Sequence, residues 1–552
     1  MGSSGAEDLK SSIQSWLDEN LTPYLDDRTI ETIFRRYVAS MAPTFPVVVF
    51  SPGTTAADIR NANPILFLSI LDVASSGFCA LEIERKIRKL IVQTYVHCML
   101  RTEQYTLDLL QALIVSAAWY RTIEPVEPGE QMDIYQISHT AANMALIMRL
   151  GESLKVKSRG SPMFPRSEKT KGPGSSFQAE SLETRRVWLG CHYICSNTSM
   201  SLHAPNVMRW TRTMDECLEV LETSPAALPS DKVLCRHIRL QHITEEFAMQ
   251  LSAEEPSTLD QNRVIQKEVT HRTFKQQLDE WRTNVVDSCW DGSLEFSYHF
   301  ARLYVCEVAH CTATSDVPYA DNTQPSSIVI EPHAFTEFMD IIDKVVRLFT
   351  SLDMSTIRAL PAMYLIRIIY TFMILVKLHF ATTKIPTKNQ LLPVDVGRLQ
   401  VSQRLNHVLQ MFAGWGPLWP ATKLTTAFLK LRSWFESEED GNQQTCSWLT
   451  VWAIRPTSMN VADATYDDGL TAASSHCPSA STDEDTLRSW LDPPLLSIDL
   501  PNIEQLNDTT DMHLDWSRFP NMCFDLDASF SPIPDSGCDS DTMKGNYTAG
   551  DV

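Results

Sequence analysis

The sequence predicts an all-α fold, in which a multi-helix body is followed by a disordered acidic tail. Three observations predict this architecture. Apolar residues recur at steps of three and four from about residue 9 to 435, as on one face of a helix. Alternation of the kind that marks strands is scarce over the same length. After about residue 456 the periodicity disappears, and polar and acidic residues dominate. Hydrophobic residues make up 43% of the 552 residues, enough for a large core.

The clearest early helix carries Ile30, Ile33 and Phe34 on one face. An aspartate at 26–27 can cap its start, and Pro43 stops it. Similar patterns predict further helices, with the last long one at 396–413. These are the runs after Pro64, 81–100, 104–120, 131–151, 183–203, 262–285, 293–312, 333–352, 356–380 and 396–413.

One stretch, 360–380, is apolar enough to suggest a membrane span. Arg367 and Lys377 interrupt it, and a charge at bilayer depth is costly. We therefore expect a buried core helix and no membrane partner. The N-terminus has neither the basic nor the apolar region of a secretory signal.

Composition divides the chain into four parts. Residues 1–27 are a short N-terminal segment, and 28–435 form the helical domain. A loop rich in Gly, Ser, Pro and Lys at 152–180 should be mobile. Residues 436–456 connect the domain to the tail, 457–552.

The thirteen cysteines are scattered, and no C-x2-C spacing occurs. Cys191 and Cys195 flank a histidine on one predicted helix, so a metal or redox site is one interpretation. Two further ligands would be needed, and buried thiols pack well, so we favour core packing. The pair at 306–311 is interpreted in the same way. We expect no metal and no cofactor.

Sequence signatures of catalysis are missing. There is no G-x-S-x-G elbow, P-loop, G-x-G-x-x-G or H-E-x-x-H. We therefore expect no catalytic residues and no enzyme. The net charge of −21 disfavours non-specific nucleic-acid binding. The basic stretch at 84–89 is interpreted as a solvated helix face, and that at 155–171 as an ordinary loop, with a nuclear-import signal as the alternative.

The tail has a more positive signature. Residues 441–552 hold 18 acidic and four basic side chains, a net charge of −14. Acidic residues alternate with bulky apolar ones, a composition typical of disordered activation domains that fold on a coactivator. The alternative is a plain solvating tail. The expected contacts are Trp490, Leu491, Leu495, Leu496, Leu514, Trp516, Phe519, Phe524, Leu526 and Phe530.

Five stretches, in order, resemble the regulatory middle homology region of fungal zinc binuclear-cluster (Zn2Cys6) transcription factors. They are "IFRRYVASMAPTFPVVVF" (33–50), "TTAADIRNANPILFLSILDVAS" (54–75), "TLDLLQALIVSAAWY" (106–120), "ISHTAANMALIMRLG" (137–151) and the region 183–222, which begins "ETRRVWLGCHYIC". In the last, the likeness is carried by Glu183, Arg185, Arg186, Trp188 and Pro205. We expect the two arginines to clamp neighbouring helices, with an effector pocket as the alternative.

The resemblance implies a helical regulatory domain, a nuclear location and control of a metabolic or secondary-metabolite gene cluster. The tail would contact the coactivator machinery. The six-cysteine zinc cluster of the family is absent from this sequence. DNA would thus be reached only indirectly or through a missing N-terminal segment, and a zinc-cluster partner or a homodimer is implied.

Two other functions stay open. One is a DNA-independent co-regulator that binds a complete zinc-cluster factor. The other is an all-α enzyme whose site is assembled from distant residues.

Overall fold

The computed structural model of the chain describes most of the helical body. The described residues are 4–21, 23–99, 105–121, 123, 132–151, 181–202, 205–252, 261–285, 290–310, 312–313, 327–330, 332–383, 396–416, 418–439 and 451–454. They form 17 α-helices and three short strands, which confirms the all-α prediction. The predicted loop at 152–180 and the tail at 457–552 lie outside the described residues.

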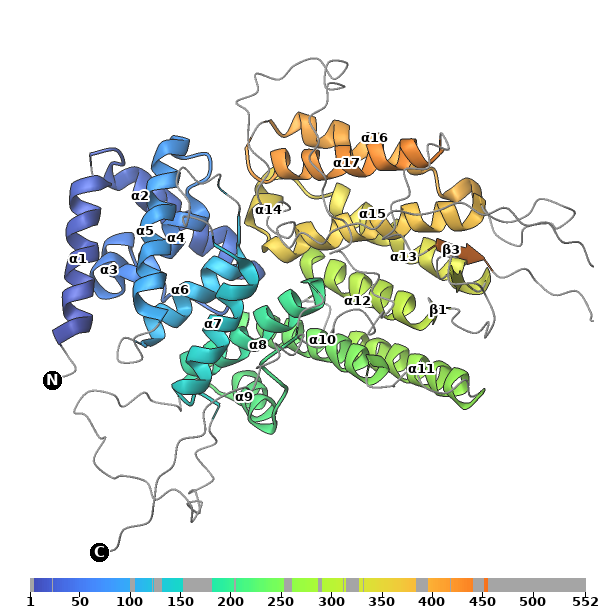
Figure 1. The fold of residues 1–552 in the computed structure, drawn as a ribbon. Coiled ribbons are helices and arrows are strands. Elements are labelled where there is room, and N and C mark those ends of the chain that lie inside the picture. Colours follow the sequence, from blue (N-terminus) through green and yellow to red (C-terminus); the bar gives the residue numbers. More distant parts are fainter. Residues whose placement is uncertain are drawn as a thin grey trace, which may run out of the picture.

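Helices from the first part of the chain lie together on one side of the molecule (Figure 1). They are α1 (Ser4–Asn20), α2 (Asp27–Arg36), α3 (Ala56–Ala62), α4 (Pro64–Ala74), α5 (Leu81–Met99), α6 (Leu107–Ala118), α7 (Ile134–Ile147), α8 (Leu182–Leu202) and α9 (Arg212–Thr223). A π-helical turn (Tyr37–Met41) and a 3-10 turn (Ala42–Thr44) follow α2 directly.

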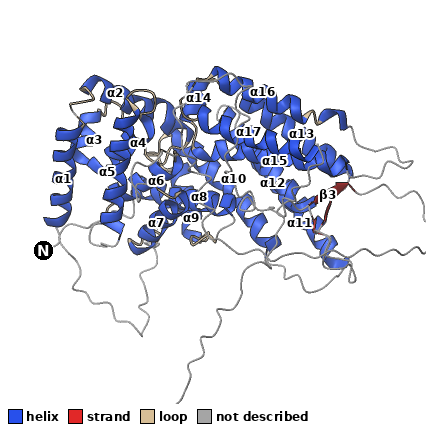
Figure 2. Cartoon of the chain, turned by 45° about the horizontal axis from the view of Figure 1, so that its top comes forward, coloured by secondary structure: helices blue, strands red, loops and turns tan. Residues whose placement is uncertain are grey.

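Helices from the second part form the other side. They are α10 (Pro229–Ser252), α11 (Gln261–Asn284), α12 (Gly292–His310), α13 (Pro332–Thr350), α14 (Met354–Ala359), α15 (Ala362–Thr383), α16 (Val401–Gly414) and α17 (Ala421–Glu439). Figure 2 shows the same two groups from a second direction.

Local sequence explains where several helices begin. Asp26 accepts a hydrogen bond from the Thr29 backbone N–H at 2.9 Å, which caps α2 as predicted. Thr55 and Asp58 form a reciprocal capping box on α3. The run at 356–380, predicted as one helix, is two, because Pro361 separates α14 from α15.

The buried side chains form two hydrophobic cores. The first is formed by residues from Ile13 to Ile238 together with Ala359, Ala362 and Met363, and the second by residues from Leu240 to Phe435. Three of the described helices have buried residues in both cores. The early part of α10 packs in the first core and its later part in the second. In α14, Ala359 lies in the first core and Ile357 in the second, and in α15 the first two residues lie in the first core and the buried residues from Tyr364 on in the second.

The apolar stretch that suggested a membrane span is α15. This helix is long and apolar enough to cross a membrane, but 83% of its most apolar part is buried inside the protein. Ile368, Phe372 and Leu375 are fully buried. The predicted core helix is confirmed.

The strands form a small sheet with the order β1-β2-β3. β1 (Thr312–Ala313) is antiparallel to β2 (Ser327–Ile330), and β2 is parallel to β3 (Val451–Ile454), with Ile328 opposite Trp452. β3 lies against α15. The predicted connecting segment thus contains a strand.

Five of the described helices lie outside the predicted runs: α3, α9 and α10 fall between them, and α1 and α17 lie at the two ends. α1 lies within the predicted N-terminal segment and buries Ile13 and Leu17 in the first core. α17 follows the helix predicted to be the last long one, and it buries Leu424, Phe428 and Leu431 in the second core. The apolar spacing of four and three in α17 is the helical signal itself.

Candidate functional site

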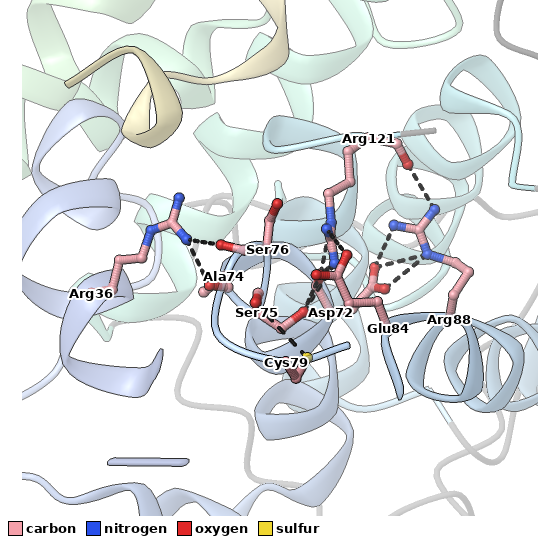
Figure 3. A network of polar contacts seen from close by, with 9 residues as sticks. All are labelled: Arg36, Asp72, Ala74, Ser75, Ser76, Cys79, Glu84, Arg88 and Arg121. Carbon is pink, nitrogen blue, oxygen red and sulfur yellow. Dashed lines mark hydrogen bonds and ion pairs between the residues drawn. The ribbon is translucent and has the colours of Figure 1, made fainter. Parts of the chain in front are cut away.

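A buried network of charged side chains joins α4, α5 and the segment after α6 (Figure 3). Asp72 is fully buried, and the Arg88 Nε lies 2.9 and 3.0 Å from its two carboxylate oxygens. The Arg121 Nη1 lies 2.6 Å from the Glu84 carboxylate. Arg88 also donates to the Arg121 carbonyl at 2.8 Å, so the two ion pairs form one unit. Each charge in the network therefore has an opposite partner, as burial requires.

A third helix, α2, joins this network through Arg36 at its C-terminal end. Its Nη1 donates to the carbonyls of Ala74 and Ser76 at 3.0 and 2.8 Å, as Figure 3 shows. These carbonyls lie at the C-terminal end of α4, where a cation is favoured. Burial lowers the pKa of Arg36 to about 10. The guanidinium thus stays charged and ties α2 to α4.

The interpretation of 84–89 as a solvated face was wrong for two residues. Glu84 and Arg88 are buried, while Lys86 is exposed. Glu84 and Arg88 are four residues apart, so they lie on one face of α5, next to the buried Ile83 and Ile87. That spacing could have indicated that both side chains are buried, but the charges that neutralise them come from other parts of the chain.

The predicted family residues are gathered around α8. The Arg186 Nε and Nη2 lie 2.5 and 2.9 Å from the two oxygens of Asp231, a bidentate pair that fixes α8 to the start of α10. Both residues are buried. Arg185 reaches the Cys217 sulfur of α9 at 3.6 Å. Glu183 accepts from the Gln111 amide of α6 at 2.7 Å.

The other two family residues, Trp188 and Pro205, pack α8 and the turn after it against neighbouring parts of the chain. Trp188 is buried, and a Cβ added to Gly151 would lie 2.3 Å from its ring. This close approach requires a glycine there. The Pro205 carbonyl accepts from the Tyr135 hydroxyl at 2.8 Å, which holds the turn after α8 against α7.

The two cysteines of α8 lie in the core, as predicted. Cys191 and Cys195 are fully buried, and the Cys195 thiol lies 3.0 Å from the Ser138 carbonyl of α7. Burial raises the pKa of both thiols, which keeps them protonated. Within the described ranges, no group of three or more His, Cys, Asp or Glu side chains could hold a metal ion.

The histidine between them belongs to a different cluster. The His192 Nε2 lies 3.0 Å from a Glu245 oxygen of α10. The Trp210 ring packs edge-on against His192 at 5.0 Å and stacks on His242 at 3.7 Å. Burial acts to raise the pKa of Glu245, but its contacts with His192, Asn206 and Ser196 outweigh burial and lower it. The cluster holds α8, α10 and the turn after α8 together.

A small cavity of about 30 Å³ lies nearby, between α8, α10, α12 and α15. None of the five family residues lines it. Its lining includes Asn197, His237 and Arg367. Sequence reasoning considered only Arg367 among these three, as a charge that argues against a membrane span. The ten predicted contacts of the tail, from Trp490 to Phe530, lie outside the described residues.

The described part of the chain is thus an all-helical scaffold, in which buried arginines join helices that are distant in sequence. Comparison with known proteins gives the family. The chain is 61% identical to "Transcription factor pbcR" of Emericella nidulans over 613 aligned residues, which cover 99% of this chain and 79% of the relative. It is also 23% identical to "Transcription factor himD" of Aspergillus japonicus over 50% of this chain and 44% of that protein.

The chain belongs to the family of fungal transcription factors that includes pbcR, and it is a fungal transcription regulator. No family model matches the sequence, and no solved structure matches it.

Proposed function

We propose that this regulator is a zinc binuclear-cluster type factor that acts in the nucleus and activates a metabolic or secondary-metabolite gene cluster. The identity of 61% with a named transcription factor over nearly the whole chain is the observation that carries the proposal. The five motifs within 33–222 support the placement in the zinc-cluster group. The helical domain at 28–435 is the regulatory part, and 457–552 is the activating part.

The tail acts by docking on the coactivator machinery. Its acidic residues repel one another and keep the aromatic residues in water, from which they can enter an apolar groove on a partner. The net charge of −14 over 441–552, with aromatic residues between the acids, supports this role.

A reporter assay tests the activating role. Residues 457–552, fused to an unrelated DNA-binding domain, should raise reporter output well above that of the DNA-binding domain alone. An inactive fusion that is present at normal levels would contradict activation by the tail.

Aromatic contact is tested in the same assay. Replacing Trp516, Phe519 and Phe524 by Ala should lower reporter output, because docking loses its large apolar side chains. The matched control replaces Ser474, Ser475 and Ser479 by Ala, which should leave output unchanged. Equal loss in both variants would show that the aromatics are not the contact.

DNA is reached indirectly, through a complete zinc-cluster factor or a homodimer, or through an N-terminal segment that this sequence does not include. The net charge of −21 disfavours direct contact between the residues of this sequence and DNA, which supports the indirect route. The purified chain should hold less than one zinc per molecule by metal analysis and should shift a promoter fragment only when a zinc-cluster factor is present. Two zinc ions per chain would contradict the indirect route.

We further propose that the chain has no catalytic activity. Both relatives are named as transcription factors. The cavity between α8, α10, α12 and α15 also brings together Arg367 and His237 without an acidic or cysteine side chain in its lining. Turnover of a small molecule by the purified chain, lost on Arg367→Gln, would contradict this.

A further inference from the structure

The cavity between α8, α10, α12 and α15 lies at the junction of the two cores, where these helices converge in Figure 1. Its lining divides into a polar and an apolar part. The polar part includes Asn197, His237, Gln241, Ser297 and Arg367, and the apolar part includes Met200, Leu240, Phe300 and Ala301.

Arg367 is 7% exposed and carries its charge into this junction. It donates to the Asn197 side-chain oxygen at 2.7 Å, the Ser297 hydroxyl at 3.1 Å and, more weakly, the Gln241 side-chain oxygen at 3.4 Å. All three acceptors are neutral. The rings of Phe300 and Tyr364 lie 5.0 and 5.7 Å from its guanidinium carbon. Among the described residues, no carboxylate forms an ion pair with Arg367.

The other deeply buried arginines each have a carboxylate partner. Arg88, Arg121 and Arg186 lie 2.8, 2.6 and 2.5 Å from a carboxylate oxygen. A buried charge is normally neutralised in this way, because its desolvation is costly. Arg367 therefore stands out as a buried cation that lacks an anion within the described structure.

His237 gives a second, independent observation. It is 2% exposed and lines the same cavity, and its Nε2 has no hydrogen-bond partner within the described structure. Burial lowers the pKa of His237 to about 4, an effect that Asp291 opposes and Arg367 reinforces. The ring is thus neutral at physiological pH, and in the appropriate tautomer its Nε2 can donate to an oxygen.

We propose that this cavity binds a short-chain aliphatic carboxylate. The carboxylate group neutralises Arg367 and accepts from His237, and the aliphatic end contacts Leu240 and Ala301. A volume of about 30 Å³ has room for only a few non-hydrogen atoms. Acetate and propionate match that size, and longer acids require Met200 to move. Met200 is half-buried, and methionine repacks readily.

Binding is measured on the purified full chain by equilibrium dialysis with labelled propionate. We expect saturable uptake of one propionate per chain. Propionamide has the same shape without the charge and should bind about tenfold or more weakly, because charge-assisted hydrogen bonds are lost. Chloride at equal ionic strength should not displace propionate.

Three variants locate the site. Ala301→Leu fills the cavity without altering Arg367, and it should lower propionate affinity about tenfold or more. Arg367→Gln removes the charge and should do the same. Arg302→Gln is the matched control: this neighbour pairs with Glu337 at 3.5 Å outside the cavity, and its loss should leave affinity unchanged. Circular dichroism checks that each variant is folded.

Three results would overturn the proposal. One is the absence of saturable uptake at about 10 mM propionate, above the dissociation constants of weak ligands. Another is equal binding of propionamide. The third is unchanged affinity in folded Ala301→Leu. Because dialysis needs neither DNA nor a reporter, these results leave the proposed transcriptional role untouched.

Discussion

Replacing Arg88 by Met tests whether the buried network of Figure 3 holds the first core together. Methionine has a volume close to that of arginine and replaces its apolar stem, so the cavity left behind is small. The charge, however, is lost. Asp72 is fully buried, and it would keep its carboxylate in the core without the guanidinium that now contacts both of its oxygens. The Arg121 carbonyl would also lose its donor.

The magnitude follows from the burial of both partners. Breaking a buried ion pair by removing one member costs about 3–5 kcal/mol, because the remaining charge is uncompensated. A native protein is stable by only about 5–15 kcal/mol, so the variant should be strongly destabilised. Replacing both partners, in Asp72→Leu with Arg88→Met, removes the unpaired charge. The double variant should therefore recover about 1 kcal/mol or more of the loss in the single variant.

Equilibrium unfolding in urea, followed by tryptophan fluorescence and circular dichroism, measures these differences. Arg35→Met is the matched control. Arg35 lies near the network in sequence but pairs with Glu31 on the surface, with its side chain 76% exposed. Its loss should cost about 0.5 kcal/mol or less. If Arg88→Met also costs less than about 1 kcal/mol, or if the double variant is no better than the single one, the ion pair is not what holds these helices.

Three further substitutions give separate tests, each by urea unfolding. Burial raises the pKa of Glu307 to about 7 from its ordinary 4.5, so the folded chain retains a proton that the unfolded chain loses, and stability falls as the pH rises from about 4.5 to 7. Glu307→Gln should flatten that fall and add on the order of 1–3 kcal/mol at pH 8, and an unchanged pH profile would contradict it. Gly151→Ala places a Cβ against Trp188 and should cost about 1–3 kcal/mol, whereas a neutral effect would show that the ring can move. Arg186→Met should cost about 3–5 kcal/mol, against under about 1 kcal/mol for the more exposed Arg239→Met, and equal losses would refute the buried clamp.

The part of the fold that could be predicted follows from local sequence patterns, namely helix caps and the spacing of apolar residues. The start of α2 at the Asp26 cap and its buried face of Ile30, Ile33 and Phe34 follow from residues within one or two helical turns. The burial of Cys191 in a helix without metal-ligand spacing could also be expected. α17 carries an equally local signal, and its omission was an error of interpretation rather than a limit of the sequence.

The polar interior could not be predicted in the same way, because its partners meet only in the folded chain. Glu84 and Arg88 look like surface charges until α4 and the segment after α6 supply opposite charges. Arg367 interrupts an apolar run, and the sequence does not show that its acceptors come from three other helices. Asn197, which accepts the shortest of these hydrogen bonds, is 170 residues away from Arg367 along the chain. Which charges are neutralised, and by what, is set by packing between distant helices.

The helix α10 bears on how this protein can be divided for experiment. Its 24 residues extend about 36 Å, and its two ends serve different cores. A cut anywhere within it would strip apolar surface from both fragments and leave each prone to aggregate. Limited proteolysis should therefore leave the body as one piece, and a shortened chain for crystallography should keep the whole of α10 together with the helices of both cores.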